Sequence, residues 1–299
     1  MDRKRIAGPE LSVPPLFDKP QIVPQELAGE GRPDGRSPED VRPIFLKTGL
    51  INQANGSAYI ELGNTKLACA VYVLFFPTHC SSAFPRLITP PPRCSYGPRQ
   101  NKKQTFSNMG LLNCEFKFAS FSCSKRRGNQ RDSQEKEYSQ ILSEALAPAV
   151  RLELFPKAMI DVFVTVLEND GTASCLAGAI TAASVAIADA GLEMIDQVAA
   201  VSAVERSHHL VFPQRTQSFA KDQILMDATS AEEKLETGTL VVSYMPSANE
   251  VTHVLQTGET EGPVTVQAIE QCIDACSKIY TVMSAALVES LKEGERPRV

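Results

Sequence analysis

The stretch from Val164 to Gly191, VTVLENDGTASCLAGAITAASVAIADAG, is the feature that most constrains the fold of this chain. An apolar run ends at a polar turn, Glu168–Thr172, and a segment rich in alanine, glycine and serine follows at once. This order predicts a buried strand that turns directly into a closely packed helix. Such turns often bind phosphate, because free backbone N–H groups and the helix dipole both favour an anion. The candidate phosphate turn is Asp170-Gly171-Thr172.

Strand patterns precede and follow this unit. Gly56–Tyr72 holds two apolar runs around Gly63-Asn64, which predicts a hairpin, and Leu111–Ser120 alternates like a strand. Lys157–Leu167 is an almost continuous apolar run, which is typical of a strand buried on both faces. Further strands are expected near residues 197–204, 223–227, 239–244 and 250–256.

Helical spacing occurs in three places. The first helix follows Ser133, a candidate N-cap, and we expect Pro148 to kink it. The second, Ala173–Ala190, is rich in small residues and contains Asp189, which favours a buried helix over a membrane span. The last is Val264–Leu291. Its expected apolar stripe consists of Val266, Ile269, Ile273, Cys276, Tyr280, Met283 and Leu287.

The proline-rich segments lack this periodicity. Residues 1–40 hold seven prolines, which predicts an extended tail before a folded domain at 41–292 and a short tail at 293–299. Residues 72–95 hold five prolines, and we interpret them as an irregular insertion. A second irregular insertion is expected at 204–217.

Charge and cysteine usage exclude several classes of protein. A net charge of −5 argues against coating nucleic acid by bulk charge, although a local basic patch stays compatible with it. The start MDRKRIAGPEL has no apolar stretch, so we expect no secretion and reduced thiols. Cys272 and Cys276 are interpreted as buried small residues, and His208-His209 as part of a solvated loop. We therefore expect neither a metal nor a cofactor.

Several short motifs occur in an order that resembles the RNase PH family. They are RPDGR (32–36), QANGSAYIELGNTKLACAV (53–71), YGPRQ (96–100), KEYSQILSEALAPAV (136–150) and the strand–turn–helix unit around Asp170. The resemblance extends over about residues 30–292, apart from the two insertions. It implies an α+β, RNase PH-like fold, similar to the second domain of ribosomal protein S five, with a mixed sheet packed with helices.

The family's catalytic groups have no counterparts in this sequence. By resemblance, Ala173 stands where the family has the arginine of its phosphate turn. Thr237 and Thr239 stand at the positions of two aspartates. A lost charge-assisted hydrogen bond costs about 1.5–3 kcal/mol, and a lost general acid costs about 10²–10⁴ in rate. The comparison predicts a turn without its chemistry, and a helix start held by Asp170 and Thr172.

A basic group follows the strand expected to end near Ser120. It consists of Lys125, Arg126, Arg127 and Arg131, with Lys117 upstream. A solvated loop and an RNA-facing patch are both open interpretations. An RNA-facing patch would bind phosphates without reading sequence.

The resemblance implies a non-catalytic subunit of the RNA exosome core ring, which supports ring assembly and RNA threading. The implied partners are other RNase PH-like ring subunits, RNA-binding cap subunits and RNA, with no membrane. The implied locations are the nucleus, the nucleolus and the cytoplasm. Two alternatives stay open: an active phosphorolytic 3′–5′ exoribonuclease and a free-standing RNA-binding protein. The first alternative expects a carboxylate from residues 232–239 beside Thr172.

Overall fold

The computed structural model describes most of the chain between residues 32 and 294. The described residues are 32, 34–74, 109–123, 126, 127, 132–155, 158–206, 223–233, 238–258, 260 and 262–294. The chain divides into two compact units, Met1–Ser37 and Pro38–Val299. All helices and strands named below belong to the second unit.

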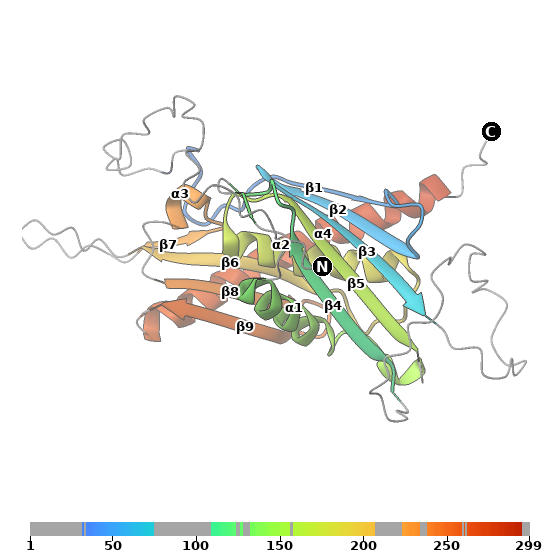
Figure 1. Cartoon of the computed structure of the whole chain (residues 1–299). Coiled ribbons are helices and arrows are strands. Elements are labelled where there is room, and N and C mark those ends of the chain that lie inside the picture. The colour runs from blue at the N-terminus through green and yellow to red at the C-terminus, as the bar shows by residue number, and fades with distance from the viewer. Residues whose placement is uncertain are drawn as a thin grey trace, which may run out of the picture. The chain divides into compact units, whose positions relative to one another are not determined.

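The described residues form a five-stranded sheet in the first part of this unit, in the order β1-β2-β3-β5-β4 (Figure 1). The strands are β1 (Ile44–Thr48), β2 (Gly56–Leu62), β3 (Thr65–Leu74), β4 (Leu111–Phe118) and β5 (Met159–Glu168). The β4 strand runs parallel to β5, whereas the other neighbours are antiparallel. The mixed sheet and the β2–β3 hairpin are therefore confirmed.

A second, four-stranded sheet comes from the later part of the sequence, in the order β7-β6-β8-β9. Its strands are β6 (Ala199–Arg206), β7 (Gln223–Met226), β8 (Gly238–Met245) and β9 (Glu250–Gly258). All three pairings are antiparallel. Each strand overlaps one that the sequence predicts.

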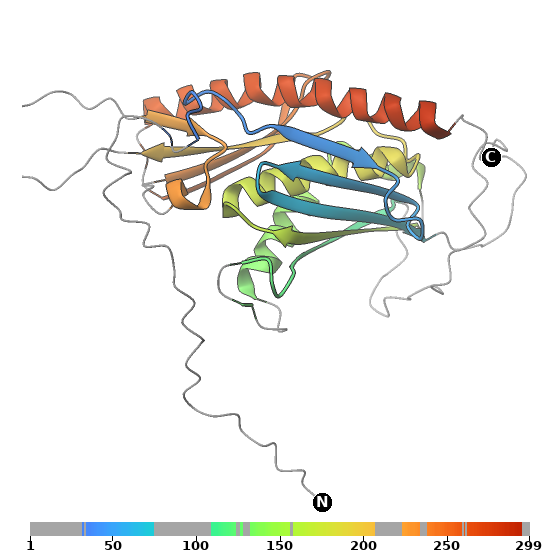
Figure 2. The same ribbon diagram turned by 90° about the horizontal axis from the view of Figure 1, so that it is seen from above.

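The helices separate and cover the two sheets. They are α1 (Ser133–Leu146), α2 (Thr172–Asp189), α3 (Ser230–Glu233) and α4 (Gly262–Gly294), with a 3₁₀ turn at Leu152–Leu154. The α2 helix lies between the sheets, and α4 covers the opposite side of the second sheet (Figure 2). The α1 helix packs mainly on β4 and α2. The result is an α+β fold in which both sheets contact α2.

Small residues let α2 approach the first sheet closely. A Cβ added at Gly178 would lie 2.7 Å from Leu62 Cδ1 and 2.8 Å from Leu67 Cδ1. A Cβ added at Gly56 of β2 would lie 2.3 Å from the Ala186 carbonyl oxygen, so only glycine fits there. By length and composition α2 could cross a membrane, but most of it is buried inside the protein. The expectation of a buried helix is confirmed.

Four local predictions are wrong. The β5 strand alternates between buried and partly exposed residues because α2 and α1 cover only one face of its sheet. Ser133 is the first helical residue, and the N-cap position belongs to Asp132, which makes no side-chain cap bond. Helix α1 ends at Leu146, so Pro148 follows the helix instead of kinking it. On α4, Val266 is 58% exposed.

The buried stripe of α4 is rotated relative to the prediction. It consists of Ala268, Cys272, Ala275, Cys276, Ile279 and Met283. Both cysteines are free thiols in the core, as the sequence predicts. Burial raises the pKa of the Cys272 thiol to about 12.

Several expected boundaries also move. The compact unit begins at Pro38, whose carbonyl oxygen accepts the Met226 N–H at 2.9 Å, and α4 continues to Gly294. The first three residues of the expected insertion 72–95 extend β3, where they pair with β5. Residues 204–206 extend β6 in the same way. The remainder of both insertions, and residues 1–31, lie outside the described residues.

Candidate functional site

The start of α2 is an anion-binding turn that already holds an anion. Gly171 is the N-cap residue, with φ +129°, and it has no side chain with which to cap the helix. The backbone N–H groups of Thr172 and Ala173 donate to the carboxylate of Glu233, at 2.8 and 3.0 Å. The Thr172 hydroxyl donates to the same carboxylate at 3.1 Å. A side chain of the protein therefore occupies the position where the helix dipole and free N–H groups favour an anion.

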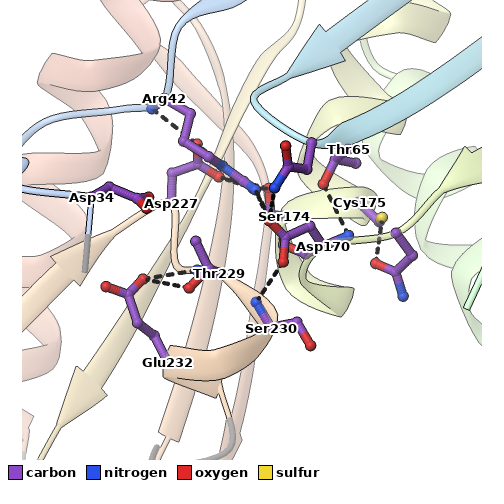
Figure 3. Close-up of polar contacts among 12 residues, drawn as sticks. Asp34, Arg42, Thr65, Asp170, Ser174, Cys175, Asp227, Thr229, Ser230 and Glu232 are labelled. Atoms are coloured by element: carbon purple, nitrogen blue, oxygen red, sulfur yellow. Dashed lines mark hydrogen bonds and ion pairs between the residues drawn. The ribbon is translucent and has the colours of Figure 1, made fainter. Parts of the chain in front are cut away.

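The short helix α3 delivers this carboxylate. The Thr229 N–H and hydroxyl donate to Glu232 Oε2, at 2.8 and 3.2 Å, which caps α3. The Ser230 N–H donates to Asp170 Oδ1 at 3.2 Å, as Figure 3 shows. Because Glu233 is the last residue of this capped helix, α3 fixes its carboxylate against the start of α2.

Asp170 has a different role from the predicted one. Its carboxylate accepts the Asn64 side-chain amide at 3.2 Å, besides the Ser230 N–H, so it joins the β2–β3 hairpin to α3. The Asp170 N–H donates to Thr65 Oγ1 at 3.2 Å. The prediction that Asp170 and Thr172 hold the helix start was wrong, because Glu233 accepts the first N–H groups of α2.

A buried ion pair lies directly behind the turn. Arg42 donates through Nε and Nη2 to both carboxylate oxygens of Asp227, at 2.9 and 2.7 Å (Figure 3). Ser174 on α2 donates to Asp227 at 2.6 Å and also contacts Arg42. Burial alone would raise the pKa of Asp227, but the hydrogen bonds and charge of Arg42 outweigh it and lower that pKa.

Arg42 of this ion pair also contacts Asp170 of the turn. Arg42 Nη1 donates to the Asp170 carbonyl oxygen at 3.1 Å and lies 3.6 Å from its carboxylate. Burial opposes the charge of Arg42, but hydrogen bonds and charge from Asp227 and Asp170 raise its pKa above the usual value. The guanidinium is therefore neutralised by residues of the fold and is not available to an added phosphate.

Two threonines were predicted to stand at the positions of the family's aspartates. Of these, Thr237 lies outside the described residues. Thr239 is in β8, and its hydroxyl shares a hydrogen bond with Thr257 of β9. The motif alignment did not single out Glu233, which sits four residues before Thr237. It lies, however, within residues 232–239, where the active-enzyme alternative expects a carboxylate.

The structure describes two residues of the predicted basic group, Arg126 and Arg127, and their surroundings differ. Arg126 is exposed, as is the upstream Lys117. Arg127 is half-buried, with its guanidinium 3.9 Å from the centre of the Phe118 ring and Nη2 donating to Gln134 at 3.1 Å. Lys125 and Arg131 lie outside the described residues. Contact of this group with RNA stays a prediction.

A hydrogen bond joins the loop that carries Arg126 to the segment just before the anion-binding turn. Asn169, the residue before Asp170, donates its N–H to the Ser122 carbonyl oxygen at 3.0 Å. Its side-chain amide also contacts Cys123 Sγ at 3.7 Å, and Arg127 Nε contacts the same sulfur at 3.2 Å. Burial would raise the pKa of the Cys123 thiol, but the polar contacts from Ser122, Asn169 and Arg127 outweigh it and lower that pKa.

Comparison with known proteins gives the class to which this fold and turn belong. Residues 40–74 and 94–193 match the "3′ exoribonuclease family, domain 1", and residues 216–278 match its domain 2. The chain belongs to this family, the RNase PH family. The domain 1 match skips residues 75–93, which lie within the expected insertion.

Relatives at about one-third identity extend over nearly the whole chain. The "Exosome complex component mtr3" of Schizosaccharomyces pombe is 33% identical over 296 residues, which cover 99% of each protein. The human "Exosome complex component MTR3" is 33% identical and covers 97% of this chain and 96% of its own. The "Exosome complex component RRP41-like" of Arabidopsis thaliana is 35% identical over 87% of this chain and 85% of its own.

A solved structure, rice Rrp46, shares the fold. It superposes with a TM-score of 0.63 at 21% sequence identity and covers 86% of this chain and all of its own. This likeness confirms the RNase PH-like architecture.

Proposed function

We propose that the protein is a non-catalytic RNase PH-like subunit of the RNA exosome core ring. Two relatives that match it over almost their full length carry the name exosome complex component. Its partners in this proposal are other RNase PH-like ring subunits, RNA-binding cap subunits and RNA. It would act in the nucleus, the nucleolus and the cytoplasm.

One observation carries the non-catalytic part of the proposal. The Glu233 carboxylate accepts the N–H groups of Thr172 and Ala173, which are the donors that a phosphate nucleophile would need. A phosphate at this position would have to displace a carboxylate that is already well bonded. It would also approach Asp170, and like charges at short range repel.

Arg42, the described cation beside the turn, is already paired and does not offset this repulsion. Ala173 replaces the arginine that the family resemblance implies, and the nearby Arg42 is engaged by Asp227. Phosphorolysis needs a cationic environment for the attacking phosphate and an acid for the leaving oxygen. Both requirements oppose activity at this site.

The alternative of an active exoribonuclease has one observation in its favour. It expects a carboxylate from residues 232–239 beside Thr172, and Glu233 is in that position. However, both Glu233 oxygens accept hydrogen bonds from the turn, so the carboxylate fills the anion site and is not directed at an empty one. We therefore prefer the non-catalytic function.

Affinity purification from cells tests the proposal. The full-length protein, affinity-tagged in cells, is purified with its partners, and mass spectrometry identifies them. The proposal expects other RNase PH-like exosome subunits in stoichiometric amounts. If the protein instead purifies as a stable monomer without such partners, the result supports the alternative of a free-standing RNA-binding protein.

The full-length protein purified without its partners tests catalysis. Labelled RNA is incubated with and without inorganic phosphate, and nucleoside diphosphates are measured by chromatography. We expect no phosphate-dependent release by the isolated chain. Release that disappears in the Thr172→Val variant would identify an active site at this turn and overturn the proposal.

A further inference from the structure

Two thiols contact the same carboxamide beside the anion-binding turn. Asn169, the residue before the turn, contacts Cys123 Sγ through its side-chain Nδ2 at 3.7 Å. The Cys175 thiol, in the first turn of α2, donates to Asn169 Oδ1 at 2.8 Å (Figure 3). The side chain of Asn169 therefore connects two cysteines that are far apart in the sequence, one in the loop before α1 and one in α2.

The two thiols differ in their access to solvent. Cys123 is partly exposed, whereas the other cysteines that the structure describes are buried. Cys175 belongs to the core between the two sheets. A small reagent in solution therefore reaches Cys123 first, and Cys175 reacts only with a group that the protein itself brings to it.

The surroundings of Cys123 favour its thiolate. Arg127 Nε donates to Cys123 Sγ at 3.2 Å, and the Ser122 hydroxyl lies 3.6 Å from the same sulfur. The two other nitrogens of the guanidinium donate to Asp132 and Gln134, which holds Nε against the sulfur. These contacts outweigh burial and lower the pKa of the Cys123 thiol. The thiolate is the form of cysteine that peroxides oxidise.

We propose that Cys123 is a peroxide-sensitive thiol and that Cys175 is its resolving cysteine, so that oxidation joins the loop before α1 to the start of α2 by a disulfide. First, the Cys123 thiolate attacks hydrogen peroxide: an S–O bond forms, the O–O bond breaks, and the leaving hydroxide takes up a proton to become water. Next, the Cys175 sulfur attacks the sulfenic acid: the S–S bond forms, the S–O bond breaks, and the Cys175 proton leaves with the hydroxide as a second water. The two thiols lose two electrons, and one peroxide is reduced to two waters.

The second step is the slow one. Burial raises the pKa of the Cys175 thiol well above its usual value, so little of its thiolate is present. The Asn169 carboxamide also has to move aside before the two sulfurs meet. The Asn169 N–H, which donates to the Ser122 carbonyl oxygen at 3.0 Å, keeps the loop beside the turn meanwhile. The sulfenic acid at Cys123 therefore persists long enough to be trapped.

Peptide mass spectrometry tests the proposal on the full-length protein. Cys80 and Cys94 are replaced by serine, so the remaining thiols are those of the described residues. The protein is treated with hydrogen peroxide, alkylated and digested with trypsin without reduction. Residues 118–125 and 158–206 form two tryptic peptides with one cysteine each. We expect these peptides to be linked with the loss of two hydrogen atoms and to separate on addition of dithiothreitol.

Variants separate the roles of the two cysteines. Cys175→Ala should leave Cys123 as a sulfenic acid, which dimedone labels, whereas Cys123→Ser should leave Cys175 reduced. The buried pair Cys272 and Cys276 of α4 is the internal control and should stay reduced in the folded protein.

Arg127 is a positioning residue in this proposal. Combined with Cys175→Ala, Arg127→Met should slow the labelling of Cys123 by peroxide and dimedone about two- to tenfold at neutral pH, because the thiolate fraction falls. Arg127→Lys should restore part of the rate. At a pH where the thiol is fully ionised in each variant, the rates should converge, which a purely structural role of Arg127 does not predict.

Each contrary outcome rejects a stated part. Oxidation of Cys123 without a link to residues 158–206 would reject Cys175 as the resolving cysteine. Oxidation of Cys272 as fast as that of Cys123 would reject the peroxide-sensitive site. The same yield of linked peptides from urea-unfolded protein would show that the native contacts with Asn169 are not needed. The proposed exosome function is decided by the partners and by the phosphate assay, so it stands or falls separately from this inference.

Discussion

The buried ion pair behind the anion-binding turn predicts a large and specific loss of stability on neutralising Asp227. Arg42 and Asp227 are each 4% exposed, and Asp227 accepts three hydrogen bonds from Arg42 and one from Ser174. Asp227→Asn leaves the Arg42 charge buried and turns an amide N–H₂ group toward its donors. The φ of Asp227 is +49°, a conformation that asparagine also accepts, so the change tests charge and not backbone strain.

The size of the effect follows from the partners that remain. Breaking a buried ion pair on one side costs about 3–5 kcal/mol. The Asp170 carboxylate, 3.6 Å from Arg42, would compensate in part, so we expect a loss of about 3 kcal/mol. For a domain of this size that corresponds to a fall in Tm of roughly 6–12 °C.

Urea unfolding of the full-length protein, followed by circular dichroism, measures the loss. Asp274→Asn, on the exposed side of α4, is the matched control and should change the free energy of unfolding by less than about 0.5 kcal/mol. The double variant Arg42→Met with Asp227→Asn should be more stable than the sum of the single changes predicts. Equal stability of Asp227→Asn and Asp274→Asn would refute the reasoning.

The Arg42–Asp227 ion pair also predicts how the stability of the protein depends on pH. The pKa of Asp227 is lower in the folded protein than in the unfolded chain, so its contribution is present above the unfolded value of about 3.9. The contribution is lost as the pH falls through the folded value. The stability difference between wild type and Asp227→Asn should therefore be constant near neutral pH and shrink only below about pH 4.

Three other predictions concern the turn, the insertion and the thiols. Glu233→Ala should free the N–H groups at the start of α2, so millimolar phosphate should raise its Tm more than that of wild type in a thermal scan; equal shifts would contradict the role given to Glu233. Deletion of residues 75–93, which the family match skips, should leave ring assembly intact by light scattering, whereas deletion of 72–95 should destabilise the protein because it removes buried Val73 from β3. With Cys80 and Cys94 replaced by serine, iodoacetamide should alkylate Cys123 first by peptide mass spectrometry, since its pKa is lowered while burial raises that of Cys175; faster labelling of Cys175 would count against this.

The sequence by itself determined the elements that depend on local spacing. The β2–β3 hairpin around Gly63, the β5–turn–α2 unit and the long helix α4 all appear close to their predicted positions. Alternation, small-residue composition and helical periodicity are properties of neighbouring residues, and they require no knowledge of what packs against them. The order of the motifs was likewise enough to predict the RNase PH-like fold.

Only the tertiary structure decided which groups meet at the turn. Glu233 reaches Thr172 across 61 positions, and Arg42 reaches Asp227 across 185. No local pattern encodes such contacts, because they arise when α3 packs on α2 and when the segment before β1 packs beside β7. The fold also decided that β5 is covered on one face only and that a carboxylate of the same chain accepts the N–H groups of the turn.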